Sequence, residues 1–155
     1  MLYYLDSSAW VKRYFDEAGS SRVRQLFAQH ETLGCSPLGL IEVGSTMARK
    51  RTAEEVKPEE FEGKRTSLLK DWRHFLRMEM TAAVVERALD ASDTYGLRGA
   101  DSVHFGVGVD SQGRTGVGGP GVRVHHFGSG VEGGGGAGGS TCDRSPPADL
   151  ISAGP

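Results

Sequence analysis

LYYLDSS, residues 2–8, is the stretch of sequence that decides the fold class. Four apolar or aromatic residues lead without a polar break into Asp6, which predicts a short buried strand with a carboxylate at its carboxyl end. Residues Ser8 to Glu17 are predicted to form a helix that Ser7 or Ser8 caps. Ligands of open α/β sheets bind beyond the carboxyl ends of the strands, so Asp6 stands where a site would lie. A helix cap or a turn residue is the alternative role for Asp6.

The rest of the first 104 residues alternates predicted strands with predicted helices. Apolar residues recur at helical spacing in several segments, and short apolar runs separate those segments. This alternation favours an α/β fold with a central parallel sheet flanked by helices. The predicted strands are residues 32–36 and 75–80; the predicted helices are residues 20–30, 38–51, 53–72 and 81–96, and a further helix begins within residues 97–104.

The overall composition narrows the class of protein. A length of 155 residues suggests one domain with a real core, and a net charge of -2 gives no general attraction to nucleic acid or to membranes. We expect no membrane span and no secretory signal, because the sequence lacks a long apolar run and a basic segment followed by an apolar one. Cys35 and Cys142 lie far apart and form no metal-type or redox-type pair, which suits a reducing cytoplasm.

The composition changes sharply near residue 105, and most of the 23 glycines follow this point. We expect residues 1–105 to form the domain and residues 106–155 to be a disordered tail rich in Gly and Pro, because such a segment buries too little apolar surface to offset its chain entropy. The glycine run Gly133–Gly136 has a phosphate-binding loop as its alternative role. That role is disfavoured, because no strand–loop–helix frame surrounds the run and no Lys-Ser/Thr pair ends it.

Three carboxylates stand beside apolar core residues, where a strand ends or a helix begins: Asp6, Glu42 and Asp101. A single acid at a helix start is usually a cap or a partner of the helix dipole. Three acids brought together would repel one another unless a cation neutralised them. Oxygen ligands suit Mg²⁺ or Mn²⁺, and a water on such a cation can be activated to attack phosphorus. A phosphotransfer domain with Asp6 as acceptor is a weaker alternative, since the second acid expected near Asp6 is absent.

Three blocks of sequence resemble the PIN-domain family, and specifically the VapC-type ribonuclease toxins of bacterial toxin–antitoxin pairs. The first, Leu5 to Tyr14, is similar to the family's opening strand, Asp-(Thr/Ser)-Ser turn and helix. The second, Ser36 to Val43, is similar to its glutamate-bearing helix. The third, Leu97 to His104, is similar to its Ala-Asp-(Ala/Ser)-(Ile/Val)-His helix start. Together the blocks cover about the first two thirds of the chain, and they imply a PIN-like three-layer α/β fold.

The resemblance implies Mg²⁺- or Mn²⁺-dependent hydrolysis of RNA phosphodiester bonds. Asp6, Glu42 and Asp101 would be the catalytic residues and the metal ligands, directly or through water. The Ser8 hydroxyl would hold the side of the metal site that contains Asp6. His104 is expected to be structural and to face the core.

The resemblance also implies protein partners: a small cognate antitoxin and a second copy of the chain in a homodimer. The antitoxin would pack on the helices around Trp10, Tyr14 and Phe61, with a basic side chain against the carboxylates. Lys12 and Arg13 could steer phosphate, but a solvated helix face is the commoner role for such residues.

The chain departs from the family after His104. The family carries a fourth acid in a Thr-x-Asp turn after a later strand, and neither Asp110 nor Asp143 follows a credible strand. We therefore hypothesise that the segment from Phe105 onward is read out of frame. A shift of one base allows codons for Leu-Ala-Ser-Ala-Leu-Thr at residues 105–110 and for Thr-Thr-Ser-Asp from residue 125. The alternative function is a catalytically inactive PIN-like remnant that only binds antitoxin or dimerises.

Overall fold

The computed structural model describes residues 2–114 and 123–125 of the chain. In chain order the elements are β1 (Leu2–Leu5), α1 (Ser7–Trp10), the 3-10 helix η1 (Val11–Arg13), α2 (Ser20–Ala28), β2 (Thr32–Cys35), α3 (Pro37–Thr52), α4 (Pro58–Trp72), β3 (Leu76–Arg77), α5 (Ala82–Tyr95), α6 (Gly99–Arg114) and β4 (Arg123–His125).

Several helix boundaries follow from local sequence. The Ser36 and Thr81 hydroxyls accept hydrogen bonds from the amides of Gly39 and Val84, so they cap α3 and α5. Proline stands at the start of both α3 and α4, where no intrahelical partner is lost. Gly96 ends α5 at a φ of 62°, a left-handed conformation that a glycine adopts without steric cost.

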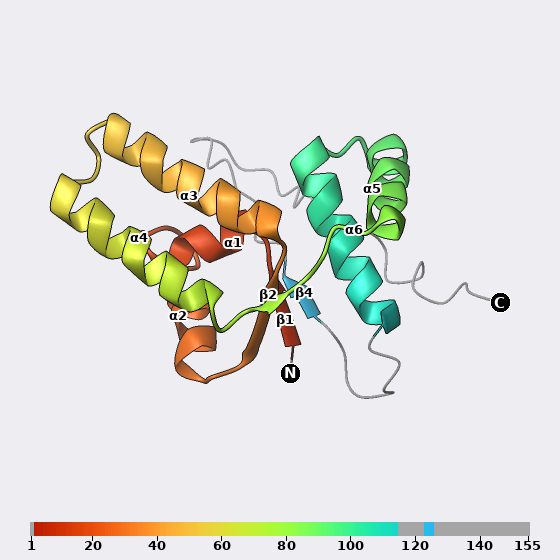
Figure 1. The fold of residues 1–155 in the computed structure, drawn as a ribbon, viewed down its shortest axis with the longest axis horizontal. Coiled ribbons are helices and arrows are strands. Elements are labelled where there is room, and N and C mark those ends of the chain that lie inside the picture. Colours follow the sequence, from red (N-terminus) through yellow and green to blue (C-terminus); the bar gives the residue numbers. More distant parts are fainter. Residues whose placement is uncertain (1, 115–122, 126–155) are drawn as a thin grey trace, which may run out of the picture.

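The strands form one parallel sheet in the order β3-β2-β1-β4 (Figure 1). Tyr3 of β1 pairs with Leu33 of β2 on one side and with Arg123 of β4 on the other. β1 is therefore an interior strand, and its carboxyl end lies between the ends of two neighbours. The arrangement confirms the predicted α/β fold with a parallel sheet.

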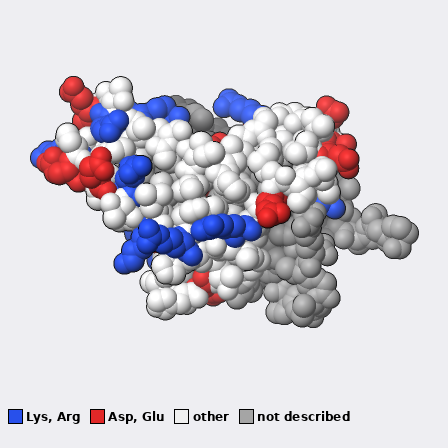
Figure 2. Space-filling view, in the orientation of Figure 1, with Lys and Arg blue, Asp and Glu red and all other residues white. Residues whose placement is uncertain are grey.

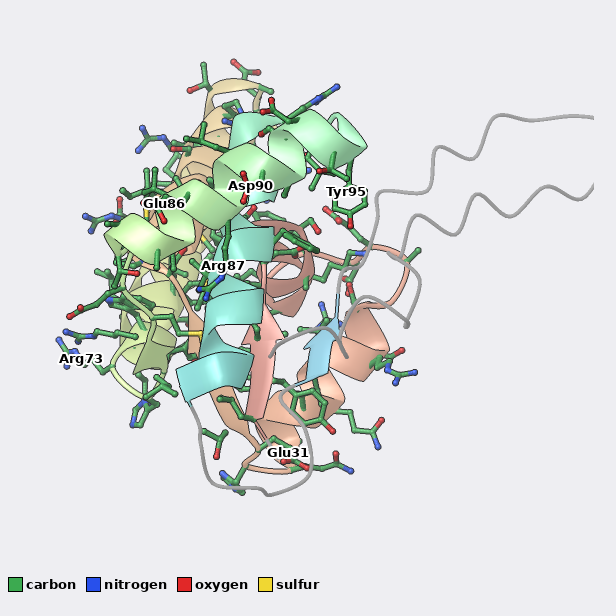
Figure 3. The ribbon with its side chains drawn as sticks, turned by 90° about the vertical axis from the view of Figure 1, so that its right-hand side faces the viewer. Glu31, Arg73, Glu86, Arg87, Asp90 and Tyr95 are labelled. Carbon is green, nitrogen blue, oxygen red and sulfur yellow. The ribbon has the colours of Figure 1, made fainter. Side chains whose placement is uncertain are left out.

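Helices cover both faces of the sheet, which gives three layers. Alternate residues of β1 enter two separate apolar clusters: Leu5 packs with side chains of α1, α3 and α4, and Tyr4 packs with Val84 of α5 and Val107 of α6. Figure 3 shows α6 lying between the sheet and α5, whose Glu86 and Asp90 point outward. Close packing of α5 on α6 depends on Gly106, because a Cβ there would lie 2.7 Å from the Val84 carbonyl oxygen.

The predicted helix from Ser8 to Glu17 is wrong in its extent. The α-helix ends at Trp10, and the 3-10 turn η1 follows and ends at Arg13. Two buried contacts accompany this turn: the Trp10 indole donates to the Tyr14 hydroxyl, and that hydroxyl donates to Asp71 of α4.

Trp10, Tyr14 and Phe61 do not form a docking surface, because all three side chains are buried in the core around α1, α3 and α4. The exposed large apolar side chains are elsewhere. They include Ile41 of α3 and Leu89 of α5, which are 63% and 62% exposed.

The predicted domain boundary at residue 105 falls inside α6, which continues to Arg114. The strand β4 is the one other described part of the predicted tail. The other predictions for the tail, including those for Asp143 and the glycine run, concern residues outside the described part of the chain. Within the described part of the chain, no helix is long and apolar enough to cross a membrane.

Candidate active site

Asp6 stands directly after β1 and caps helix α1. Its Oδ1 atom accepts hydrogen bonds from the amide of Ala9 at 2.7 Å and from the Ser8 hydroxyl at 2.9 Å. The side chain is buried, and both donors favour the charged carboxylate. Asp6 is therefore a helix cap, and it also stands at the carboxyl end of an interior strand. The predicted contact between Ser8 and Asp6 is present.

Glu42, on helix α3, belongs to a hydrogen-bonded chain of three side chains. Its Oε2 atom lies 2.7 Å from Nε2 of His104, and Nδ1 of the same imidazole lies 2.6 Å from the Tyr4 hydroxyl. His104 is on α6 and Tyr4 is on β1, so these hydrogen bonds connect both helical layers to the sheet. The imidazole is almost fully buried, whereas the side chain of Glu42 is 28% exposed. The Glu42 carboxylate is thus held by a buried imidazole and remains accessible to solvent.

Cys35, at the end of β2, has a fully buried side chain whose thiol is influenced by the charges of both acids. Burial raises the pKa of its thiol well above the ordinary value, and the charges of Asp6 and Glu42 raise it further. The same thiol is close to Gly39: a Cβ on Gly39 would collide with Cys35 Sγ and lie 3.3 Å from Cε1 of His104. The first turn of α3 therefore needs a glycine here to let the imidazole reach Glu42.

Asp101 is placed differently from the other two acids. It lies in the first turn of α6 and its side chain is exposed. In the part of the chain that the structure describes, no three His, Cys, Asp or Glu side chains gather closely enough to hold a metal ion together. The described geometry thus relates Asp6 and Glu42 through Cys35, and leaves Asp101 on the surface.

The basic residues after Asp6 are engaged elsewhere. Lys12 is buried, and Arg13 lies 3.4 Å from Asp71 and stacks 4.4 Å from the centroid of the Phe27 ring. Neither one is a free cation on a solvated face. On the face drawn in Figure 2, Lys and Arg form a band below the centre, and most acidic side chains lie toward the two ends.

The carboxylates of Asp6 and Glu42 provide part of the ligand set that a hard divalent cation requires. Mg²⁺ keeps several waters and is commonly bound by one or two carboxylates together with substrate phosphates. Asp6 and Glu42 meet that requirement in chemistry, and both act electrostatically on one buried thiol. Asp101 is exposed and does not join them in a group of three ligands among the described residues.

Sequence reasoning placed His104 in the core, and its burial confirms this. It missed the contacts that His104 makes with Glu42 and Tyr4. One signal was available for Tyr4: the period of two in a strand puts residues 4 and 6 on the same side. The approach of α3 to α6 depends on tertiary packing and had no local signal.

Comparisons with known proteins agree with this fold. A family model described as PIN domain matches residues 3–108. Ribonuclease VapC45 and Ribonuclease VapC49 of Mycobacterium tuberculosis are each 30% identical over 127 residues, which is 79% of this chain and 81% of theirs. A solved structure, that of VapBC2 from Rickettsia felis bound to a DNA fragment from their promoter, is similar with a TM-score of 0.50 and 13% identity, covering 72% of this chain and 83% of that one. That likeness concerns the fold.

Proposed function

The chain belongs to the PIN-domain family, and to its VapC ribonucleases, and we propose that it is the ribonuclease toxin of a toxin–antitoxin pair. It would hydrolyse RNA phosphodiester bonds at Asp6, Glu42 and Asp101. One observation carries this assignment: two carboxylates from different elements meet at strand β1, Asp6 directly after its last residue and Glu42 of α3 through His104, which contacts Tyr4 of that strand. Parallel sheets place their ligand chemistry at the carboxyl ends of their strands.

Mg²⁺ or Mn²⁺ would be held by Asp6 and Glu42, with Asp101 binding through water. The cation, when bound, would supply positive charge for the scissile phosphate and a water that loses its proton more readily. The protein residues have defined tasks. Ser8 and the Ala9 amide keep the Asp6 carboxylate in place, and His104 does the same for Glu42.

The test is an Asp6→Asn variant of the full chain. Asparagine caps helices about as well as aspartate, so α1 should keep its cap while the ligand charge is lost. RNA cleavage with Mn²⁺ should fall at least about 100-fold. Mn²⁺ should raise the thermal midpoint of the wild type and leave that of the variant unchanged, because only the wild type gains binding energy.

The matched control is Asp90→Asn, which removes a carboxylate from the outer surface of α5 (Figure 3). It should cleave RNA like the wild type. Unchanged cleavage by Asp6→Asn would sink the proposed mechanism.

The second candidate function is a catalytically inactive remnant that only binds antitoxin or dimerises. The exposed position of Asp101, apart from the other acids, favours it. A Mn²⁺ titration of the wild type separates the two functions, because only the ribonuclease needs a cation at the acids.

The proposed partner is a small antitoxin with an apolar segment and a guanidinium that pairs with the carboxylates. Ile41 precedes Glu42 on α3 and is 63% exposed, so it offers apolar contact next to a site acid. A homodimer, as implied by the family resemblance, stays a prediction. The RNA substrate would be met in the cytoplasm, which we propose as the location.

A further inference from the structure

The buried contacts behind Glu42 extend the proposed function to two more residues. We propose that Tyr4 and His104 are positioning residues: the Tyr4 hydroxyl fixes one tautomer of His104, and that imidazole orients the Glu42 carboxylate for metal binding. The inference rests on the proposed function, since it takes Glu42 as a ligand. Neither residue would touch the cation or the RNA.

The direction of the hydrogen bonds follows from the chemistry of the phenol. A phenol, with an ordinary pKa of about 10, keeps its proton at neutral pH. Nε2 of His104 lies 2.7 Å from a carboxylate oxygen of Glu42, which accepts, so Nδ1 of the neutral imidazole is left to accept from the Tyr4 O–H at 2.6 Å.

An imidazole that accepts at Nδ1 carries its proton at Nε2 in the neutral form. That proton points at Oε2 of Glu42, 2.7 Å away. The other carboxylate oxygen, Oε1, makes no hydrogen bond with any residue that the structure describes. One oxygen of Glu42 is thus held by the protein, and the other is left for a ligand on the solvent side. Partners of this kind set the orientation and basicity of metal-binding side chains.

The packing around His104 holds its imidazole next to Tyr4 and Glu42. His104 is buried between β1 and the first turn of α3, and its Cε1 atom comes close to Gly39, which has no side chain to exclude it. The rings of Tyr4 and His104 lie 5.8 Å apart at a tilt of 57°. The imidazole has little room to rotate away from Glu42.

The experiment uses the full chain with three variants: His104→Gln, His104→Leu and Tyr4→Phe. Two quantities are measured: the tautomer of His104 by ¹⁵N NMR of its ring without metal, and the affinity for Mn²⁺ by calorimetry. The wild type should show the Nε2–H tautomer. Tyr4→Phe should give a mixture of tautomers and bind Mn²⁺ several-fold more weakly, because Nδ1 has lost its donor.

His104→Leu should weaken Mn²⁺ binding about 10- to 100-fold. His104→Gln should recover most of that loss, because its amide N–H can replace the Nε2–H donor. The matched control is Tyr14→Phe, which removes another buried phenol that donates to Asp71 at 2.8 Å. It should lower stability and leave Mn²⁺ affinity unchanged.

Three results would overturn the inference: an Nδ1–H tautomer in the wild type, wild-type Mn²⁺ affinity in Tyr4→Phe or in a folded His104→Leu, or a loss in Tyr14→Phe equal to that in Tyr4→Phe. Each can occur while the wild type still binds Mn²⁺ and cleaves RNA, so the proposed function would stand. A wild type that neither binds Mn²⁺ nor cleaves RNA would instead remove the proposed function, and the positioning role with it. If His104→Leu does not fold, the other two variants still test the positioning role.

Discussion

Replacing Gly39 by alanine should destabilise the protein, although alanine is the better helix former. The new Cβ would collide with Cys35 Sγ, which is fully buried, and would lie 3.3 Å from His104 Cε1. Overpacking of this kind costs about 1–3 kcal/mol. Alanine in place of glycine inside a helix returns about 0.5–1 kcal/mol. We therefore expect Gly39→Ala to lower the free energy of unfolding by about 1–2 kcal/mol.

Gly44 provides the matched control in the same helix. Apart from its chain neighbours and the backbone of its own helix, no heavy atom of a described residue lies within 4 Å of a Cβ built there, so Gly44→Ala should raise the free energy of unfolding by about 0.5–1 kcal/mol. Urea unfolding followed by tryptophan fluorescence measures both variants, since Trp10 is fully buried.

A double-mutant cycle tests the cause of the Gly39→Ala loss. Cys35→Ala removes the sulfur that the new Cβ would meet, so Gly39→Ala should cost about 1 kcal/mol less in that background. If Gly39→Ala is as stable as the wild type, or if the cycle shows no coupling, the close approach of α3 to β2 is not as described.

Alkaline pH should unfold the protein, because burial raises the pKa of Cys35, Tyr4 and Tyr14 above ordinary values of 9.0 for the thiol and 10.0 for the phenols. As the pH rises, the unfolded chain loses these protons before the folded chain does. Above its ordinary pKa, each group therefore lowers the free energy of unfolding by about 1.4 kcal/mol per pH unit. Urea titrations that give the same free energy of unfolding from about pH 8 to about pH 11 would contradict this prediction. Co-expression with the neighbouring upstream reading frame should raise the soluble yield, and Ile41→Ser should lose the co-purified partner while keeping RNA cleavage; equal solubility alone, with nothing co-purifying, would refute the antitoxin proposal. The gene, read one base into the codon of Phe105, should encode a helix continuation and a later Asp, and early stop codons in that frame would show that the hypothesis of a frame change is wrong.

Local signals in the sequence sufficed for the elements with clear caps and turns. The predicted helix of residues 81–96 is confirmed, and its ends are set by the Thr81 hydroxyl, which caps its start, and by Gly96, which ends it. The third predicted strand is shorter than expected, since β3 is limited to Leu76–Arg77 at the edge of the sheet. Edge position is a property of the whole fold and leaves no mark in a short apolar run.

The candidate site was predicted unevenly for the same reason. Asp6 could be found because it directly follows an apolar strand, and its role as a cap follows from local geometry. Glu42 stands next to Ile41, an apolar residue that the structure leaves exposed. The partner of Glu42 is 62 residues away along the chain, and no periodicity within α3 could indicate it.

The pairing of β1 with β4 affects how the protein forms during synthesis. β1 leaves the ribosome first, and β2 follows soon enough to pair with one side of it. The other side pairs at Tyr3 with Arg123, so it stays an unpaired edge until nearly all of the described chain has emerged. An open edge of an apolar strand is a template for pairing with other chains, and contacts between distant positions form late. Nascent chains paused before β4 should thus be the species most prone to aggregate, and most in need of a chaperone.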